Sequence, residues 1–205
     1  MKHIFARSTI TRTCHKKYSD YRRFKDYLKK DFNNRCAYCD LRDLWIEPLP
    51  YQIDHFIPMK EIKAAKRFEL ETTYSNLMYA CPVCNRLKSD MFSGSIDPCK
   101  IENQLFYNPD NDNMNDHFYR DDKGRIMSDD KKGKEIIERL QLYRPTKQWG
   151  WYLDELYEVY QIHEARIKTE TNSEVKEKYE IARNQVGNAL FQKRMYFAHS
   201  YKNKR

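Results

Sequence analysis

The sequence has few of the residues that interrupt regular structure, with 5 glycines and 7 prolines among 205 residues. It also lacks an apolar run near the roughly 18 to 20 residues that a membrane-spanning helix needs, and its mean hydropathy is −0.97. These absences exclude a fibrous chain, a broadly disordered chain and a transmembrane protein. With 40% hydrophobic and 14% aromatic residues, the chain has enough apolar surface for one compact domain or a small domain with an elaboration.

The N-terminal residues also lack the apolar core and small-residue cleavage site of a secretory signal, so we expect a cytoplasmic protein. Four of the six cysteines form two Cys-x-x-Cys pairs. In a reducing compartment this spacing favours metal binding over disulfide formation. Cys14 and Cys99 have no visible partner and are interpreted as ordinary thiols.

Positive charge is concentrated at the start of the chain. The net charge is +8 and the pI is about 9.0. Residues 1–35 hold 11 Lys and Arg against 3 Asp, a net +8, whereas residues 36–205 hold 27 charges of each sign. Such a basic arm favours a polyanionic partner, with Arg22 and Arg23 as candidate nucleic-acid contacts. The alternative interpretation is a solvated helix face.

Spacing and capping signals divide the chain into three predicted regions. Ser19-Asp20 can cap a helix that runs to about Asp31. Its apolar stripe is interpreted as core and consists of Tyr21, Phe24, Tyr27, Leu28 and Phe32. A strand-like segment lies at 51–57, and a hairpin is expected to turn at 122–124. Long antiparallel helices are predicted at about 147–168 and 173–197. The predicted domains are a basic arm and helix (1–33), a core with an extension (34–130) and a C-terminal helical region (131–205).

The strongest motif is a metal framework. Two tight Cys-x-x-Cys knuckles supply the four sulfur ligands of a tetrahedral zinc site. An ion there would hold the start of the intervening insertion against its end. By this spacing we predict a structural zinc ion bound by Cys36, Cys39, Cys81 and Cys84.

A second group of polar residues lies within and just after this framework. Asp54 and His55 are adjacent on the strand-like segment, so their side chains should leave on opposite faces. Asn76 precedes the second knuckle and Asn85 follows it directly. Taken alone, an Asp-His pair is usually structural or incidental.

The order of these motifs changes that interpretation. Residues 36–90 contain Cys-x-x-Cys, Asp-His-x-x-Pro, Asn-Leu and Cys-x-x-Cys-Asn-x-x-Lys-Ser in turn. This arrangement resembles the HNH endonuclease family, whose ββα-metal fold is often bracketed by zinc knuckles. The resemblance implies that Asp54 and Asn85 are ligands of a catalytic metal and His55 is the general base. It also implies that Asn76 braces the loop that orients the histidine. Asp and Asn replace the histidines of the family's two-histidine form.

These residue types suit phosphodiester hydrolysis. A divalent ion held by oxygen ligands, Mg²⁺ or Mn²⁺, offsets the charge that accumulates on the phosphoryl and leaving oxygens. A neutral His55 can take a proton from the attacking water, since the unperturbed imidazole pKa lies near 6.5. Lys88 and Arg86 follow Asn85 closely and are candidate contacts to flanking phosphates. Ordinary surface charge is the alternative for both.

The downstream half carries a second resemblance. Ser95-Ile-Asp97-Pro, Asp116-His117-Phe and Asp122-Lys-Gly-Arg-Ile are similar to segments of PtuB-like HNH nucleases from Septu and retron anti-phage systems. Those nucleases act with an ABC-type ATPase, so the resemblance implies such a partner. It also implies that Asp97 and His117 belong structurally to an extended core.

We therefore predict an α+β protein with a zinc-stapled ββα-metal core, an N-terminal helix and a C-terminal helical elaboration. Its predicted activity is metal-dependent hydrolysis of DNA. A catalytically silent zinc-ribbon DNA-binding module is one alternative, although a mere binder has no need of Asp54, His55 and Asn85 together. A free-standing phage or restriction nuclease and a subunit held inactive until a partner releases it are the others. No residue excludes RNA as a substrate.

Overall fold

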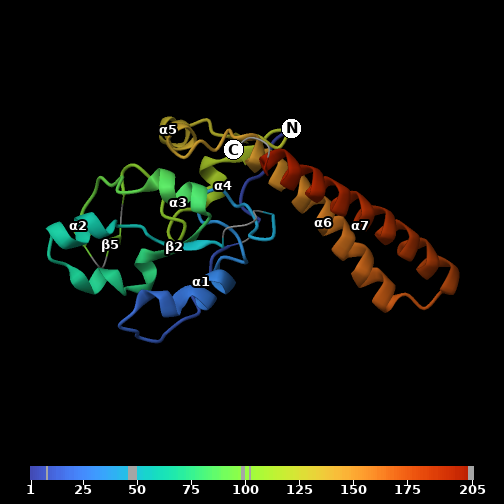
Figure 1. Ribbon diagram of the computed structural model, residues 1–205, viewed down its shortest axis with the longest axis horizontal. Helices are drawn as coiled ribbons and strands as arrows, with labels where there is room; N and C mark the ends of the chain where they lie inside the picture. Colours follow the sequence, from blue (N-terminus) through green and yellow to red (C-terminus); the bar gives the residue numbers. More distant parts are fainter. Residues whose placement is uncertain (8, 46–49, 98–99, 102, 203–205) are drawn as a thin grey trace. The chain divides into compact units, whose positions relative to one another are not determined.

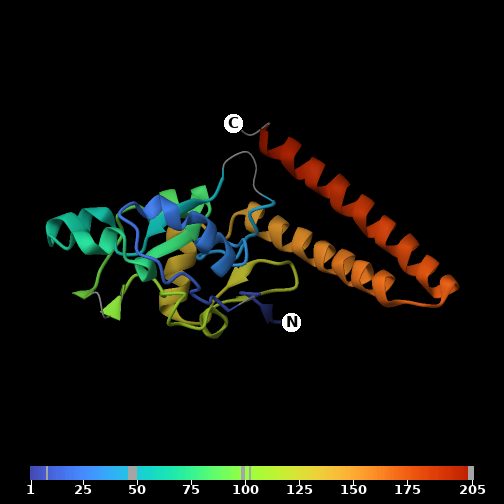
Figure 2. The same ribbon diagram turned by 90° about the horizontal axis from the view of Figure 1, so that it is seen from below.

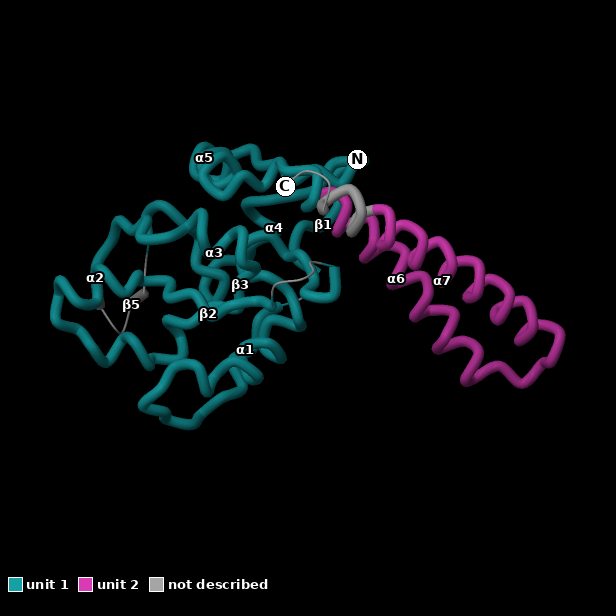
Figure 3. The backbone as a smooth tube through the Cα atoms, in the orientation of Figure 1, with its two compact units in different colours: residues 1–147 teal, residues 148–205 magenta. Residues whose placement is uncertain are grey.

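The computed structural model describes all residues except 8, 46–49, 98–99, 102 and 203–205. It divides the chain into two compact units, Met1–Lys147 and Gln148–Arg205 (Figure 3). The first unit therefore extends beyond residue 130, where we predicted the core to end. Helices and strands occur together, which confirms the predicted α+β class.

Strands β2 and β3 and helix α3 form the centre of the first unit (Figure 1). β2 (Gln52–His55) pairs antiparallel with β3 (Leu77–Ala80), in a register that places His55 opposite Leu77. α3 (Pro82–Lys88) follows β3 and packs on β2. The connection between the strands contains α2 (Met59–Ala64) and 3₁₀ turns at Phe68–Glu71 and Tyr74–Asn76.

Local sequence explains the join between β3 and α3. All four residues of β3 are buried, as in a strand covered on both faces. Pro82 stands at the start of α3, where its missing N–H costs no hydrogen bond and its fixed φ suits a helix. The Sγ atom of Cys81 accepts a hydrogen bond from the backbone N of Cys84 and caps the helix. Both cysteines of the second knuckle are thus placed by one helix start.

The N-terminal helix forms as predicted. The carboxylate of Asp20 accepts a hydrogen bond from the backbone N of Arg22 (2.9 Å). A 3₁₀ turn (Tyr21–Phe24) then leads into α1 (Lys25–Asp31), which packs on β3. The buried members of the predicted apolar stripe are Phe24, Leu28 and Phe32.

The remainder of the first unit surrounds this centre with short elements. The predicted hairpin is present: β6 and β7 are antiparallel, and Gly124 in their turn has a φ of 72°, which glycine adopts without strain. β1 pairs with the other edge of β6. These elements are β1 (His3–Ile4), β4 (Ile96–Asp97), β5 (Lys100–Ile101), α4 (Met114–His117), β6 (Tyr119–Arg120), β7 (Ile126–Met127) and α5 (Lys131–Arg139). Cys99 lies outside the described residues.

The second unit consists of two long antiparallel helices (Figures 1 and 2). α6 (Pro145–Thr169) begins in the last residues of the first unit, and α7 (Ser173–Lys202) follows a short link. Arg183 on α7 pairs with Glu164 on α6 at 2.9 Å. The predicted bounds agree with these to within a few residues. In the part of the chain that the structure describes, no helix is both long and apolar enough to cross a membrane.

The basic arm is used differently from our prediction. Both carboxylate oxygens of Asp110 accept a hydrogen bond from Nε of Arg12 (2.9 Å each), and the Leu77 carbonyl accepts another from its Nη1 (2.8 Å). Arg35 is 4% exposed and pairs with Asp40. These two guanidiniums hold the fold together, so the charge that the arm offers to an external polyanion is smaller than its composition suggests. Arg22 and Arg23 are exposed.

Candidate functional site

Four cysteines from two distant segments meet beside the central hairpin. The Sγ atoms of Cys36, Cys39, Cys81 and Cys84 all lie within 4.8 Å of one another, and all four residues are buried. Among the described residues, this is the one group of three or more His, Cys, Asp or Glu side chains close enough to share an ion. A tetrahedral ion with zinc–sulfur bonds of about 2.3 Å places its sulfurs about 3.8 Å apart. The Cys39 and Cys81 sulfurs are 3.9 Å apart, so the cluster has the dimensions of a zinc site.

A buried lysine reaches this cluster. Nζ of Lys147 lies 3.1 Å from the Sγ atom of Cys39 and 3.3 Å from that of Cys81. Burial by itself would lower the pKa of Lys147, but attraction by the cysteine sulfurs outweighs burial and raises that pKa. The pKa of Cys81 is lowered, chiefly by hydrogen bonds with the other cysteines and further by Lys147.

His55 lies at the end of β2 and is 8% exposed. Its Nε2 donates to the backbone carbonyl of Glu71 (3.0 Å), which leaves Nδ1 as the nitrogen able to accept a proton. The ring of Tyr21 meets the imidazole edge-on, with centroids 4.7 Å apart. Burial lowers the pKa of His55, so the neutral, basic form prevails near pH 7.

Asn76 braces two segments, one just after His55 and one just before Glu71. It is completely buried, and its Oδ1 accepts a hydrogen bond from the backbone N of Ile57 (2.8 Å). Its Nδ2 donates to the carbonyls of Ile57 (3.3 Å) and Leu70 (3.1 Å). One amide thus ties the residues just after His55 to the turn that contains Glu71.

Asp54 and its neighbour His55 contact different elements, as expected for adjacent residues of a strand. Its carboxylate accepts a hydrogen bond from the hydroxyl of Tyr38 and pairs with Nζ of Lys88 at 3.0 Å. Burial raises the pKa of Asp54, and Lys88 and Tyr38 oppose that rise. Tyr38 lies between the two cysteines of the first knuckle, so it connects the cysteine cluster to Asp54.

The structure corrects the prediction that Lys88 contacts nucleic acid. Lys88 is fully buried, and its Nζ also donates to the carbonyl of His55 (2.8 Å). The reason is helical periodicity: Lys88 lies three residues after Asn85 and so shares the face of α3 that packs on β2. Arg86 is exposed.

Asn85 lies on the same face of α3, nearer its start. Its Nδ2 donates to Oε1 of Gln52 (2.7 Å), two residues before Asp54 on β2. This orientation leaves the Oδ1 atom of Asn85 as a ligand atom. Since alternate strand residues share a face, Gln52 and Asp54 both point toward α3. The structure therefore gathers Asp54, Asn85 and Lys88 on one side of β2 and places the imidazole of His55 on the other.

Sequence reasoning missed three contributors to this region. Tyr21 was interpreted only as part of an apolar stripe, Tyr38 was an unassigned residue inside a knuckle, and Lys147 was treated as the start of a helix. No short-range signal identifies Lys147, because 63 residues separate it from Cys84. His117 stacks on the ring of Tyr107, with centroids 3.6 Å apart.

An antiparallel strand pair, a following helix and paired cysteine knuckles form a ββα arrangement beside the four-cysteine cluster. Residues 36–91 match the family described as HNH endonuclease, so the chain contains an HNH domain. This confirms the predicted family and locates it on the elements that carry the cysteines, Asp54 and His55.

The comparison with curated proteins extends beyond this segment. The chain is 26% identical over 145 residues to "Septu protein PtuA" of Bacillus mycoides (strain KBAB4). The match covers 62% of this chain but 20% of that relative, so the chain spans about a fifth of its length. The predicted Septu resemblance is confirmed, although this relative is called PtuA and the predicted likeness was to PtuB. No solved structure matches.

Proposed function

We propose that this protein is a metal-dependent HNH endonuclease that hydrolyses DNA, with His55 as its general base. The observation that carries this proposal is the geometry of His55: its Nε2 is held by the Glu71 carbonyl, which leaves Nδ1 to take a proton. Burial lowers the pKa of His55, which favours the neutral form. A pure DNA-binding module would gain nothing from an imidazole oriented in this way. In the reaction, Nδ1 of His55 accepts the proton of the attacking water, and Asn76 maintains the carbonyl that orients the ring.

We further propose that Asp54 and Asn85 hold one Mg²⁺ or Mn²⁺ ion. Both residues offer oxygen atoms, the donor type that these ions take, and both lie where α3 packs on β2. Lys88 at the Asp54 carboxylate offsets part of its charge. When bound, the ion supplies positive charge against the phosphoryl and leaving oxygens. The four-cysteine cluster is proposed to hold the structural zinc ion.

Cleavage of supercoiled plasmid tests the proposal. Wild-type protein, His55→Ala and His163→Ala are purified identically and incubated with plasmid, with and without Mg²⁺ or Mn²⁺. His163 is the matched control because it is a histidine of α6, outside residues 36–91. We expect His55→Ala to lose activity by at least about 100-fold, the usual range for a general base. The His163→Ala protein should cleave like wild type.

Zinc content and melting temperature are measured on every variant, so that loss of the fold is separated from loss of chemistry. Activity of His55→Ala equal to that of His163→Ala, in folded proteins, would refute the role of His55. If neither the wild-type protein nor the variants cleave DNA when the ions are present, a binding-only protein or one that needs a partner is favoured.

The metal assignment has its own test. In Asn85→Ala, the Mn²⁺ concentration that gives half-maximal cleavage should rise, because one oxygen ligand is gone. In Asn85→Asp it should fall, because a carboxylate binds a hard cation more strongly than an amide does. An unchanged Mn²⁺ dependence in both variants would contradict the assignment.

We propose Arg22, Arg23 and Arg86 as contacts to the phosphate backbone, since all three are exposed. Each phosphate contact contributes about −0.9 to the slope of log K against log salt for duplex DNA. The Arg22→Ala/Arg23→Ala double variant should therefore reduce that slope by about 2 in a filter-binding or anisotropy titration. A slope identical to wild type would remove both residues from the interface.

We propose that the protein acts in anti-phage defence together with an ABC-type ATPase, on the strength of its 26% identity to a Septu protein. Cells that express the chain together with the ATPase from its own locus should plate phage less efficiently than cells with either protein alone. The His55→Ala chain should not protect. Equal protection by His55→Ala would show that defence does not depend on this site.

A further inference from the structure

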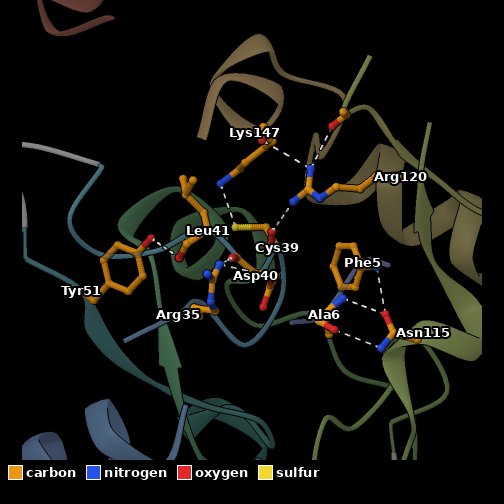
Figure 4. Close-up of polar contacts among 11 residues, drawn as sticks. Phe5, Ala6, Arg35, Cys39, Asp40, Leu41, Tyr51, Asn115, Arg120 and Lys147 are labelled. Carbon is orange, nitrogen blue, oxygen red and sulfur yellow. Dashed lines mark hydrogen bonds and ion pairs between the residues drawn. The ribbon is translucent and has the colours of Figure 1, made fainter. Parts of the chain in front are cut away.

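The contact between Lys147 and the cysteine cluster is not explained by the nuclease chemistry. Nζ of Lys147 lies within hydrogen-bond distance of three sulfurs: 3.1 Å from Cys39, 3.3 Å from Cys81 and 3.7 Å from Cys84. The side chain is 1% exposed, so water does not compete for the ammonium protons. Figure 4 shows the amine pointing at the Cys39 sulfur.

Arg120 supports the contact between Lys147 and the cysteine cluster through hydrogen bonds to backbone carbonyls. Its guanidinium donates to the carbonyl of Cys39 (3.2 Å) and to the carbonyl of Lys147 (3.4 Å), as Figure 4 shows. A third donation goes to the carbonyl of Gly124 (2.9 Å). Arg120 is 2% exposed. One buried guanidinium therefore connects the first knuckle, the β6–β7 hairpin and the residue that carries the ammonium.

Charge explains why a cation is needed at this position. Four thiolates and one Zn²⁺ carry a net charge of −2, and burial of uncompensated charge is costly. An ammonium that contacts three of four tetrahedrally arranged sulfurs lies over one triangular face, outside the centre that an ion takes. Lys147 and a zinc ion thus fit the cluster together, and the ammonium offsets half of the excess charge.

We propose that Lys147 is the charge-balancing hydrogen-bond donor of the zinc–thiolate site and that it slows loss of the ion. The inference rests on the proposed zinc ion but not on nuclease activity. It adds to the HNH segment a residue that lies far outside positions 36–91. The zinc site of this protein is therefore completed by the downstream extension, and the HNH segment alone lacks one of its parts.

The test measures zinc release and needs no substrate. Full-length wild-type protein, Lys147→Met and Lys147→Arg are analysed for zinc by elemental analysis and then mixed with excess EDTA, and zinc release is followed over time. Loss of a residue that supports metal ligands typically costs about 10- to 100-fold in metal affinity. We expect Lys147→Met to release zinc faster by a factor in that range, and Lys147→Arg to retain most of the wild-type behaviour.

Lys88→Met is the matched control. Lys88 is also a fully buried lysine of the same unit, but it pairs with Asp54 and not with sulfur. If Lys88→Met accelerates zinc release as much as Lys147→Met does, general destabilisation explains the effect and the proposal is overturned. Release at the wild-type rate from Lys147→Met would overturn it as well.

A spectroscopic measurement separates hydrogen bonding from packing. In protein loaded with Co²⁺ in place of zinc, the sulfur-to-cobalt charge-transfer band reports the energy of the thiolate lone pairs. Removal of N–H···S donors raises that energy, so the band of Lys147→Met should move to longer wavelength, while that of Lys88→Met should stay in place. An unshifted band in Lys147→Met overturns the proposal even if that variant is less stable.

Failure of the zinc assignment itself gives a different result. If wild-type protein grown in zinc-supplemented medium does not contain stoichiometric zinc, the zinc assignment and this inference are both overturned. The proposed role of His55 is unaffected by that result. Loss of activity in His55→Ala with normal zinc release in every variant would support the nuclease and overturn only the role of Lys147.

Discussion

Two fully buried lysines of the first unit contact different kinds of acidic group. Lys88 is 0% exposed and faces a single carboxylate, that of Asp54. Lys147 is 1% exposed and faces a cluster of cysteine sulfurs. Lys88 comes from inside the HNH segment and Lys147 from 56 residues beyond its last position, 91.

The difference predicts which of the two sites requires a metal ion. One ammonium balances one carboxylate, so the Asp54 end is near neutrality without an ion. All four cysteines can be thiolates together only beside a divalent cation, because one ammonium cannot balance four negative charges in a buried site. We therefore expect folding to depend on zinc at one end and on a protein ion pair at the other.

The largest effect should follow from Cys81→Ser, which tests the metal-dependent end. Structural zinc contributes apparent binding energies of about 10 kcal/mol or more in small domains. Loss of a ligand should therefore abolish cooperative unfolding of residues 1–147 in calorimetry. Cys14→Ser is the control, because Cys14 is a buried cysteine outside the cluster. A Cys81→Ser protein that melts as Cys14→Ser does would contradict the comparison.

The next effect should come from Lys88→Met at the carboxylate end. Removing one partner of a buried ion pair costs about 3 to 5 kcal/mol, because the other charge is left buried alone. Adding Asp54→Asn to Lys88→Met should restore part of that loss, since no charge then remains. Chemical denaturation of Lys88→Met, Asp54→Asn and the double variant measures the coupling free energy between the two residues. Strictly additive losses would mean that the pair is not a unit.

Tyr38→Phe should have a smaller effect and tests the link between the two ends. The variant removes the hydroxyl that donates to the Asp54 carboxylate but leaves the ring beside the cysteines. Hydrogen bonds to charged groups contribute about 1.5 to 3 kcal/mol, which is the loss we expect in urea denaturation. Zinc content should stay stoichiometric. If zinc is lost instead, the two ends are coupled more tightly than the comparison states.

The smallest loss of stability should come from Asp130→Ala, which serves as a reference outside the two lysine sites. Asp130 caps α5, where its Oδ1 accepts a hydrogen bond from the backbone N of Gly133 (2.6 Å). Asp130→Ala should cost about 1 kcal/mol at pH 7, the usual value for an N-cap. A larger loss would show that the extension is not merely peripheral.

The pH dependence of that loss has a defined sign. Partial burial opposes ionisation of Asp130, but the Gly133 N–H and the Tyr107 hydroxyl outweigh it and lower its pKa. The contribution of Asp130 is therefore complete above the unfolded value of about 3.9 and is lost as the pH falls through the lower folded pKa. The stability difference between wild type and Asp130→Ala should shrink below about pH 4. A difference that grows on acidification would contradict this sign.

Much of the site was predictable because the relevant spacings are short. The Cys-x-x-Cys pairs define their own knuckles, and Asp54 and His55 diverge because strand neighbours always do. Residues whose contacts are distant were mispredicted. Lys88 seemed free to reach phosphate, although its position three residues after Asn85 places it against β2. Arg12 counted as free positive charge, although Asp110, 98 residues away, pairs with it.

Residue types and local spacing were thus sufficient to predict the class of fold and the grouping of the four cysteines. Tertiary structure decided which charged groups are available. A charged residue looks the same in the sequence whether its side chain contacts water, a carboxylate or a sulfur. Only the folded chain brings Lys147 to the cysteines. Contacts between residues far apart in the sequence therefore decide which cationic side chains are buried in the structure and which are exposed to a partner. The sequence pattern does not encode those contacts.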